Sequence, residues 1–228
     1  MRAKKMTRPQ IEAFYTSLAA RHPEPRTELD YSNPYTLLVA VVLSAQSTDV
    51  GVNKATRRLF AEADTPEKML ALGEARVREH IKTIGLFNSK AKNVIALSQI
   101  LVDEHGGEVP DTREALVKLP GVGRKTANVV LNEAFGQETF AVDTHIFRVA
   151  NRTGLGAGKT PLAVELAVLK ATPKPYRRHA HHWLILHGRY TCVARKPKCG
   201  ICPVHAQCNW PEKGSDSVHD PNDIKSQQ

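Results

Sequence analysis

Lys125 and Asp143 have the residue types and the spacing needed for covalent chemistry by an amine beside a carboxylate. Two glycines in residues 119–123 (LPGVG) predict a tight turn, and the apolar periodicity of residues 126–135 predicts an amphipathic helix directly behind it. Lys125 then lies in the first turn of that helix, where the dipole and burial would both favour the neutral amine, which is a nucleophile. Asp143 follows eighteen residues later, far enough for the chain to fold back and bring its carboxylate near that amine.

The glycine turn is also a candidate phosphate site. Residues 111–118 predict a second short helix, so the unit is a helix, a glycine hairpin and a helix. The hairpin N–H groups, at Gly121 and Gly123, are then free at a helix N-terminus and form an anion site. Each piece also has a plainer interpretation: a connector between helices, a solvated lysine, and Asp143 as the N-cap of the following helix.

Composition favours an intracellular protein with a polyanionic partner. The 228 residues, 41% of them hydrophobic, allow one large or two small domains with a real core. The formal net charge of +9, from 32 Lys and Arg against 23 Asp and Glu, points to a nucleic acid. No run of about eighteen apolar residues is present to span a membrane, and no apolar segment of a signal peptide follows the basic residues 1–5.

The four cysteines are candidate metal ligands, because clustered cysteines in a long intracellular chain are seldom disulfides. Their spacing is x6, x2 and x5, and four thiolates this close can surround one tetrahedral zinc or one [4Fe–4S] cluster. Spacing alone leaves both metals open. The ligands would be Cys192, Cys199, Cys202 and Cys208, and the cations between the first two, either facing DNA phosphate or merely solvated, are Arg195, Lys196 and Lys198.

The apolar pattern predicts helices throughout, and no long period-2 alternation occurs, so the expected fold class is all-α. We expect residues 1–9 to be loose and residues 213–228, which are polar, to be a disordered tail. Asp111 and Glu114 predict a capping box at the start of the helix before the hairpin. The other predicted helices are residues 11–21, 35–44, 49–60, a short helix that Thr65-Pro66 opens, 74–84, 90–105, 144–152, 161–170 and 176–187.

At the hairpin the chain resembles the endonuclease III family of DNA-repair glycosylases, in which LPGVG is followed by a catalytic lysine and later by VDTH with a catalytic aspartate. The matching residues here are 119–123, Lys125 and 142–145. The resemblance covers roughly residues 10–212. It implies two helical domains that flank a DNA-binding cleft: a sequential helical barrel at residues 27–137, and a discontinuous domain from residues 1–26 and 138–212. It also implies a [4Fe–4S] cluster at the cysteine spacing found here, in place of zinc.

The same resemblance implies a bifunctional DNA glycosylase and abasic-site lyase that removes oxidised pyrimidines. Lys125 would attack the sugar C1′ and form a Schiff base that permits β-elimination of the 3′ phosphate, and Asp143 would activate the amine. Because such an enzyme must extrude its target nucleotide and fill the gap, the family's plug and wedge fall on Gln46 and Leu86. Without the resemblance these two would be an ordinary loop glutamine and a hydrophobe packed on the core, and His145 is either a phosphate contact or structural.

Two rival functions remain at this point. One is a monofunctional mismatch glycosylase, a relative that shares the hairpin, the aspartate and the cysteines but lacks the lysine. The other is a non-catalytic helix-hairpin-helix DNA-binding module with a structural zinc. For the bifunctional enzyme, we expect a monomer that acts on double-stranded DNA with damaged bases or abasic sites and is cytoplasmic and nucleoid-associated.

Overall fold

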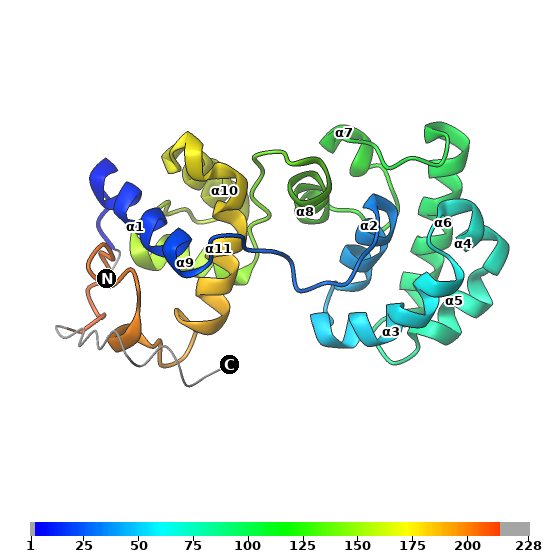
Figure 1. Ribbon diagram of the computed structural model, residues 1–228, viewed down its shortest axis with the longest axis horizontal. Helices are drawn as coiled ribbons and strands as arrows, with labels where there is room; N and C mark the ends of the chain where they lie inside the picture. The colour runs from blue at the N-terminus through cyan, green and yellow to red at the C-terminus, as the bar shows by residue number, and fades with distance from the viewer. Residues whose placement is uncertain (1–2, 215–228) are drawn as a thin grey trace. The chain divides into compact units, whose positions relative to one another are not determined.

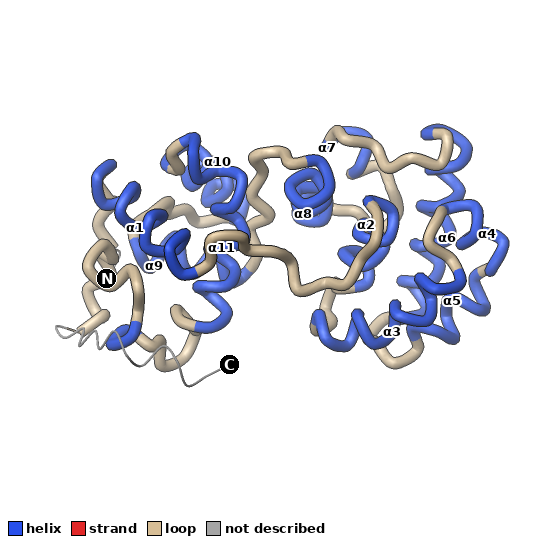
Figure 2. The backbone as a smooth tube through the Cα atoms, viewed as in Figure 1, coloured by secondary structure: helices blue, strands red, loops and turns tan. Residues whose placement is uncertain are grey.

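The computed structural model describes residues 3–214, and in this range the chain is helical with no β-strand, as the sequence predicts (Figures 1 and 2). The chain divides into two compact units. One comprises Met1–Pro25 and Val142–Gln228, and the other comprises Arg26–Ala141. None of the described helices is long and apolar enough to cross a membrane.

The unit Arg26–Ala141 is built around one buried helix. Nearly every residue of α2 is apolar, so the helix is buried on all sides, and it packs against α3, α6 and α8 (Figure 1). Asn33 caps it and Pro34 occupies its first turn, as predicted. The helices of this unit are α2 (Pro34–Leu43), α3 (Asp49–Glu62), α4 (Pro66–Leu72), α5 (Glu74–Ile81), α6 (Phe87–His105), α7 (Arg113–Leu116) and α8 (Arg124–Phe135).

Several predicted boundaries in this unit were wrong by a few residues. The helix α5 ends at Ile81 and not at residue 84, and α6 begins at Phe87 and not at residue 90. The cause is Leu86, whose left-handed backbone starts α6 earlier without a capping side chain. The cap of α7 is Thr112, which accepts from the N–H of Ala115, and not the predicted Asp111.

The other unit packs α9 against α11 and α1 against α11. Its core is aromatic: Phe14, Tyr15 and Trp183 lie together, and the Trp183 indole N–H donates to the carbonyl of His22 at 2.7 Å. Buried polar groups on large rings need such partners. The helices of this unit are α1 (Arg8–Arg21), α9 (Thr144–Thr153), α10 (Pro161–Ala171), η1 (Lys174–Tyr176), α11 (Arg177–Tyr190) and η2 (Cys199–Ile201).

The N-terminal segment is held in place, so the expectation that residues 1–9 are loose was wrong for those that the structure describes. Met6 is 3% exposed, and its N–H donates to the carbonyl of Gly154 at 2.9 Å. Thr7 and Gln10 form a capping box that starts α1 at Arg8. Periodicity could not reveal this, because the partner of Met6 lies about 150 residues away in the sequence.

The predicted tail at residues 213–228 lies almost wholly outside the described residues, which end at 214. Lys213, which is described, is tied to the cysteine loop. Its ammonium donates to the carbonyls of His205 at 2.8 Å and Cys208 at 2.6 Å.

Asn128 links α8 to the segment that follows it. This side chain is 1% exposed; its amide donates to the carbonyl of Phe140 at 2.8 Å and accepts from Arg113 Nε at 2.8 Å. The hydroxyl of Thr139 donates to the Asn128 carbonyl at 2.6 Å. Because a buried carbonyl without a donor is costly, Asn128 fixes the path by which the chain leaves α8.

We predict that Asn128→Ala lowers the free energy of unfolding by about 2–3 kcal/mol, because the Phe140 carbonyl and the Arg113 guanidinium lose their partner. Urea denaturation followed by circular dichroism measures this. The exposed Asn88 is the matched control, and its replacement by alanine should change the unfolding free energy by no more than about 0.5 kcal/mol. Equal effects of the two substitutions would contradict the prediction.

Candidate active site

The glycine hairpin before α8 is fixed by its packing on the core. Gly121 has a φ of 78°, and a Cβ there would lie 3.0 Å from Asn93 Nδ2 and 3.2 Å from Val42 Cγ1. Leu119 and Val122 on either side are buried. Only glycine combines this left-handed backbone with so close an approach to α2 and α6.

Gly123 occupies the N-cap position of α8 and offers no side chain to the first turn of the helix. It is exposed, and nothing lies within 4 Å of where its Cβ would be. The start of α8 therefore presents backbone donors toward open space, as an anion site requires.

Lys125 is the second residue of α8, and its side chain is exposed. The burial considered from the sequence is absent. The position in the first helical turn is as predicted, so the ammonium lies at the positive end of the helix dipole.

Asp143 is the N-cap of α9. Its Oδ1 accepts from the backbone N–H groups of His145 and Ile146, each at 2.9 Å. Asp143 is thus an N-cap, as the plainer interpretation states, but the cap uses only one oxygen of the carboxylate. The cap fixes the orientation of the carboxylate and leaves Oδ2 outside these two bonds. Lys125 belongs to the unit Arg26–Ala141, and Asp143 to the other unit.

His145 belongs to a structural network. Its Nδ1 lies 3.2 Å from Nη2 of Arg148, which donates to the carbonyl of Gly188 at 2.7 Å. A Cβ at Gly188 would lie 2.9 Å from the Cβ of His145, so α9 and α11 cross closely here. These contacts support the structural interpretation of His145.

Gln46 and Leu86 occupy two adjacent loops with the same unusual backbone. Their φ angles are 55° and 60°, in the left-handed region that side chains other than glycine seldom adopt. Both are exposed, Leu86 by 57%. A Cβ on Gly85 would lie 3.8 Å from the carbonyl oxygen of Gln46, so the loops touch. Because Leu86 is exposed on a strained turn, it does not fit the alternative interpretation of a hydrophobe packed on the core.

The loop that holds Gln46 is tied to α6 by Lys90, which sequence reasoning did not identify. Its ammonium donates to the hydroxyl of Ser47 at 2.9 Å, although Lys90 is only 4% exposed, and burial lowers the pKa of this amine. The signal available in the sequence was a lysine on the apolar face of α6, next to Ala91 and Val94. Its partner lies 43 residues away, which a local pattern cannot show.

The four cysteines line one cavity, as their spacing predicts. Burial raises the pKa of Cys202 to about 12, although the backbone N–H of Val204 donates to its sulfur, and burial also raises the pKa values of Cys199 and Cys208. Thiolates in this cavity would repel one another, so a bound cation must compensate their charge.

The donor set consists of four thiols that line one cavity. Such an arrangement suits a multi-atom iron–sulfur cluster with one thiolate to each iron.

Arg152 braces the cysteine loop and was also missed. From α9 it donates to the sulfur of Cys192 at 3.6 Å and to the carbonyl of Val193 at 2.8 Å, and its guanidinium lies 4.5 Å from the ring centre of Trp210.

The loop cations do not take part in these bonds. Arg195, Lys196 and Lys198 are exposed, as the interpretation of a loop facing phosphate requires.

Comparison with known proteins agrees with this geometry. Residues 39–174 match the family model of the HhH-GPD superfamily of base excision DNA repair proteins. Residues 192–208 match the iron–sulfur binding domain of endonuclease III. The chain is 58% identical to endonuclease III of Haemophilus influenzae and of Escherichia coli (strain K12), and each alignment covers 87% of this chain and 94% of the relative. The chain belongs to the endonuclease III family.

Among solved structures, the chain is similar to a trapped covalent intermediate of endonuclease III with DNA, with a TM-score of 0.82 and 44% identity over 89% of this chain and 96% of that one. It is also similar to a thermostable thymine-DNA glycosylase, with a TM-score of 0.78 and 27% identity over 90% and 95% of the two chains. As a member of the family, it is a base excision DNA glycosylase with abasic-site lyase activity, and it binds DNA and a [4Fe–4S] cluster.

We predict that Lys90→Met loosens the Gln46 loop, because the loop loses its hydrogen bond to α6. Hydrogen exchange of the amides of residues 44–48 should become about five- to tenfold faster, which corresponds to one hydrogen bond of about 1 kcal/mol. The exposed Lys92 on α6 provides the control, since Lys92→Met should change nothing in this loop. Unchanged exchange in Lys90→Met would show that the bond does not hold the loop.

Proposed function

We propose that Lys125 is the nucleophile that excises oxidised pyrimidines. Its neutral amine attacks the sugar C1′, the C1′–N bond breaks, and the base leaves with the bonding electrons and is protonated. The C1′–O4′ bond of the sugar then breaks and O4′ takes up a proton, which leaves a Schiff base at C1′. This Schiff base acidifies C2′–H, so loss of that proton expels the 3′ phosphate by β-elimination. The supporting observation is that Lys125 lies exposed behind a glycine hairpin without a side-chain cap. The similar endonuclease III structure that holds a covalent DNA intermediate also favours this chemistry.

Asp143 activates this amine and stabilises the cationic sugar in our proposal. Its Oδ1 is occupied by two N–H donors of α9, which hold the carboxylate plane at the helix start. Its Oδ2 then accepts the proton of the amine or faces the developing positive charge. One side chain thereby combines the cap and the chemistry.

The remaining predicted contacts divide by chemistry. The N–H groups at Gly121 and Gly123 and the loop cations Arg195, Lys196 and Lys198 bind DNA phosphate without regard to sequence. Gln46 and Leu86 enter the base stack, where Gln46 takes the space of the extruded nucleotide and Leu86 acts as the wedge. Of the two roles predicted for His145, its contact with Arg148 favours the structural one over the phosphate contact.

Four thiolates, Cys192, Cys199, Cys202 and Cys208, hold the cluster, whose bound iron keeps the loop folded. We assign the unit Arg26–Ala141 to the helical barrel that the resemblance implies at residues 27–137, and the other unit to the cluster-carrying domain that it implies at residues 1–26 and 138–212. We further propose that the enzyme acts as a monomer on genomic DNA, in the cytoplasm and at the nucleoid.

Lys125→Ala should abolish the adduct that borohydride traps on abasic DNA and should abolish strand cleavage, while DNA affinity changes by no more than a few-fold, since one cation among many contributes little. Lys118→Ala is the control, because this exposed lysine lies on the other side of the same hairpin. Gel electrophoresis after reduction measures the adduct. An adduct formed by Lys125→Ala would assign the chemistry to another amine.

Asp143→Asn should slow base release by about 10²- to 10⁴-fold, because the charge is lost, and leave the thermal midpoint nearly unchanged, because asparagine is an equally good N-cap. Preformed abasic sites should retain more activity, since the base is already gone. Asp143→Ala removes the cap too, which costs about 1 kcal/mol of stability. If Asp143→Asn releases the base at the wild-type rate, the carboxylate has a structural role only.

A further inference from the structure

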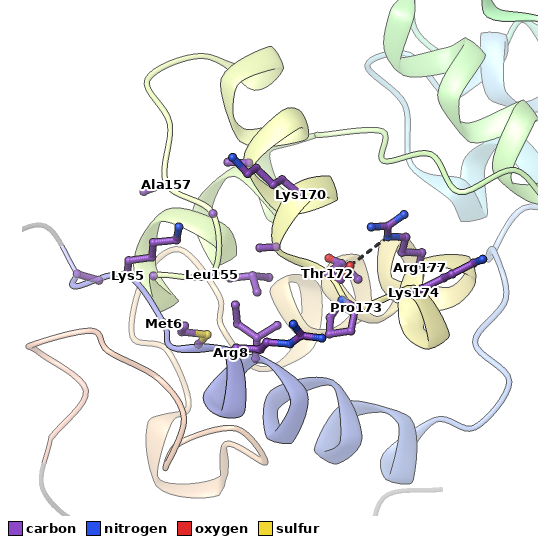
Figure 3. A pocket seen from close by; sticks show the side chains of 16 residues that line it. Lys5, Met6, Arg8, Leu155, Ala157, Lys170, Thr172, Pro173, Lys174 and Arg177 are labelled. Carbon is purple, nitrogen blue, oxygen red and sulfur yellow. Dashed lines mark hydrogen bonds between the residues drawn. The ribbon is translucent and has the colours of Figure 1, made fainter.

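A cavity of about 810 Å³ lies in the unit that contains α1 and α10, and its lining residues differ from those of the cavity that the cysteines line (Figure 3). We call it the α1–α10 pocket. It is lined by the N-terminal segment at Lys5 and Met6, the start of α1, residues 154–157, the end of α10, and the segment 172–177. Its volume is typical of ligand-binding pockets.

The N-terminal segment that forms one side of the pocket is fixed by two hydrogen bonds. The Met6 N–H bonds to Gly154, and the Asn209 amide donates to the carbonyl of Lys4 at 3.2 Å. Small residues keep the opposite wall close to the backbone: a Cβ at Gly156 would lie 2.7 Å from the Val168 side chain. The pocket is therefore a built feature of the fold.

Its rim is strongly basic. Five cationic side chains line it, and none of the described residues that line it is acidic; the cations are Lys5, Arg8, Lys170, Lys174 and Arg177. Arg177 Nε donates to the carbonyl of Thr172 at 3.0 Å. Arg8 Nε lies 3.4 Å from Oε1 of Glu12, in an exposed ion pair on α1. Lys5 and Lys170 extend from two different elements on the side of the pocket where Ala157 lies (Figure 3). Charges of one sign gathered in a concavity attract a polyanion.

The floor decides which polyanion fits. It consists of aliphatic groups, among them Met6, Ile11 and Leu155. The backbone N–H groups of Met6, Gly156 and Thr172 are already bonded to carbonyls, so they offer no donors to a phosphate inside. The described lining contains no aromatic ring on which a base could stack. The fitting ligand has an aliphatic group for the floor and acidic groups for the rim.

We propose that the α1–α10 pocket binds an acidic peptide segment of a partner protein, with one aliphatic side chain on the Met6 and Leu155 floor and carboxylates paired with Lys5 and Lys170. An apolar anchor inside a charged rim is the usual arrangement of a peptide-binding site. The site does not depend on the assignment of Lys125 or Asp143. It gives the repair enzyme a place to be recruited by another protein.

The test uses the full chain with its cluster and the fluorescein-labelled peptide Glu-Asp-Glu-Leu-Asp-Glu-Asp-Glu, with binding followed by fluorescence anisotropy. Replacing both Lys5 and Lys170 by glutamate should weaken binding by at least about tenfold. The matched control replaces the exposed Lys54 and Lys159, which do not line the pocket, by glutamate as well. It should weaken binding by no more than about twofold. Strand cleavage of abasic DNA shows that both variants are folded.

Two further arms separate the alternatives. Ala157→Trp fills the pocket without a change of charge and should also weaken binding of the peptide by about tenfold. Replacing the leucine of the peptide by alanine should weaken binding by a similar factor. Equal losses in the pocket and control variants, or binding that ignores the leucine, would overturn the proposal in favour of general charge attraction. Tripolyphosphate that binds as tightly as the peptide would make the site a phosphate pocket. A loss of undamaged-duplex affinity confined to the pocket variants would make it part of the DNA surface.

Discussion

The left-handed backbone of Gly121, packed against Val42 and Asn93, is the constraint on which the reactive region depends. It lets the hairpin lie directly on the buried helix α2, so that α8 starts at a fixed place with Gly123 as a cap without a side chain. The first turn of α8 then has no side-chain cap from Gly123 and carries the exposed Lys125. A side chain at residue 121 would push the hairpin off α2 and disturb both features at once.

Two other contacts act in the same way on neighbouring parts of the molecule. Lys90 fixes the Gln46 loop to α6 by a part-buried hydrogen bond, and Arg152 fixes the cysteine loop to α9. In both, a cation on a regular helix holds an irregular segment that has too little apolar surface to hold itself. The cluster completes the second arrangement, because the four thiols that line one cavity stay together as ligands once iron compensates the charge of their thiolates.

Local chemistry in the sequence predicted the helices, the hairpin and the cysteine site. Thr65 caps the helix that it was expected to open, and α8 ends at Phe135, where the predicted apolar helix ends. The predictions that were wrong concern features that the local apolar pattern does not show. The start of α6 follows from the strained turn at Leu86, and the order of the N-terminal segment follows from Gly154 and Asn209. The sequence indicates only that Lys90 lies on one face of a helix, because nothing in the neighbouring sequence shows that Ser47 lies opposite.

The central claim is that the amine at the uncapped start of α8 does the chemistry. The direct measurement is to trap the wild-type enzyme on duplex DNA with an abasic site by borohydride, digest the adduct with protease and locate the modified amine by mass spectrometry. The account predicts that the sugar remnant is on Lys125. A remnant on any other lysine, or on the N-terminal amine, would contradict it.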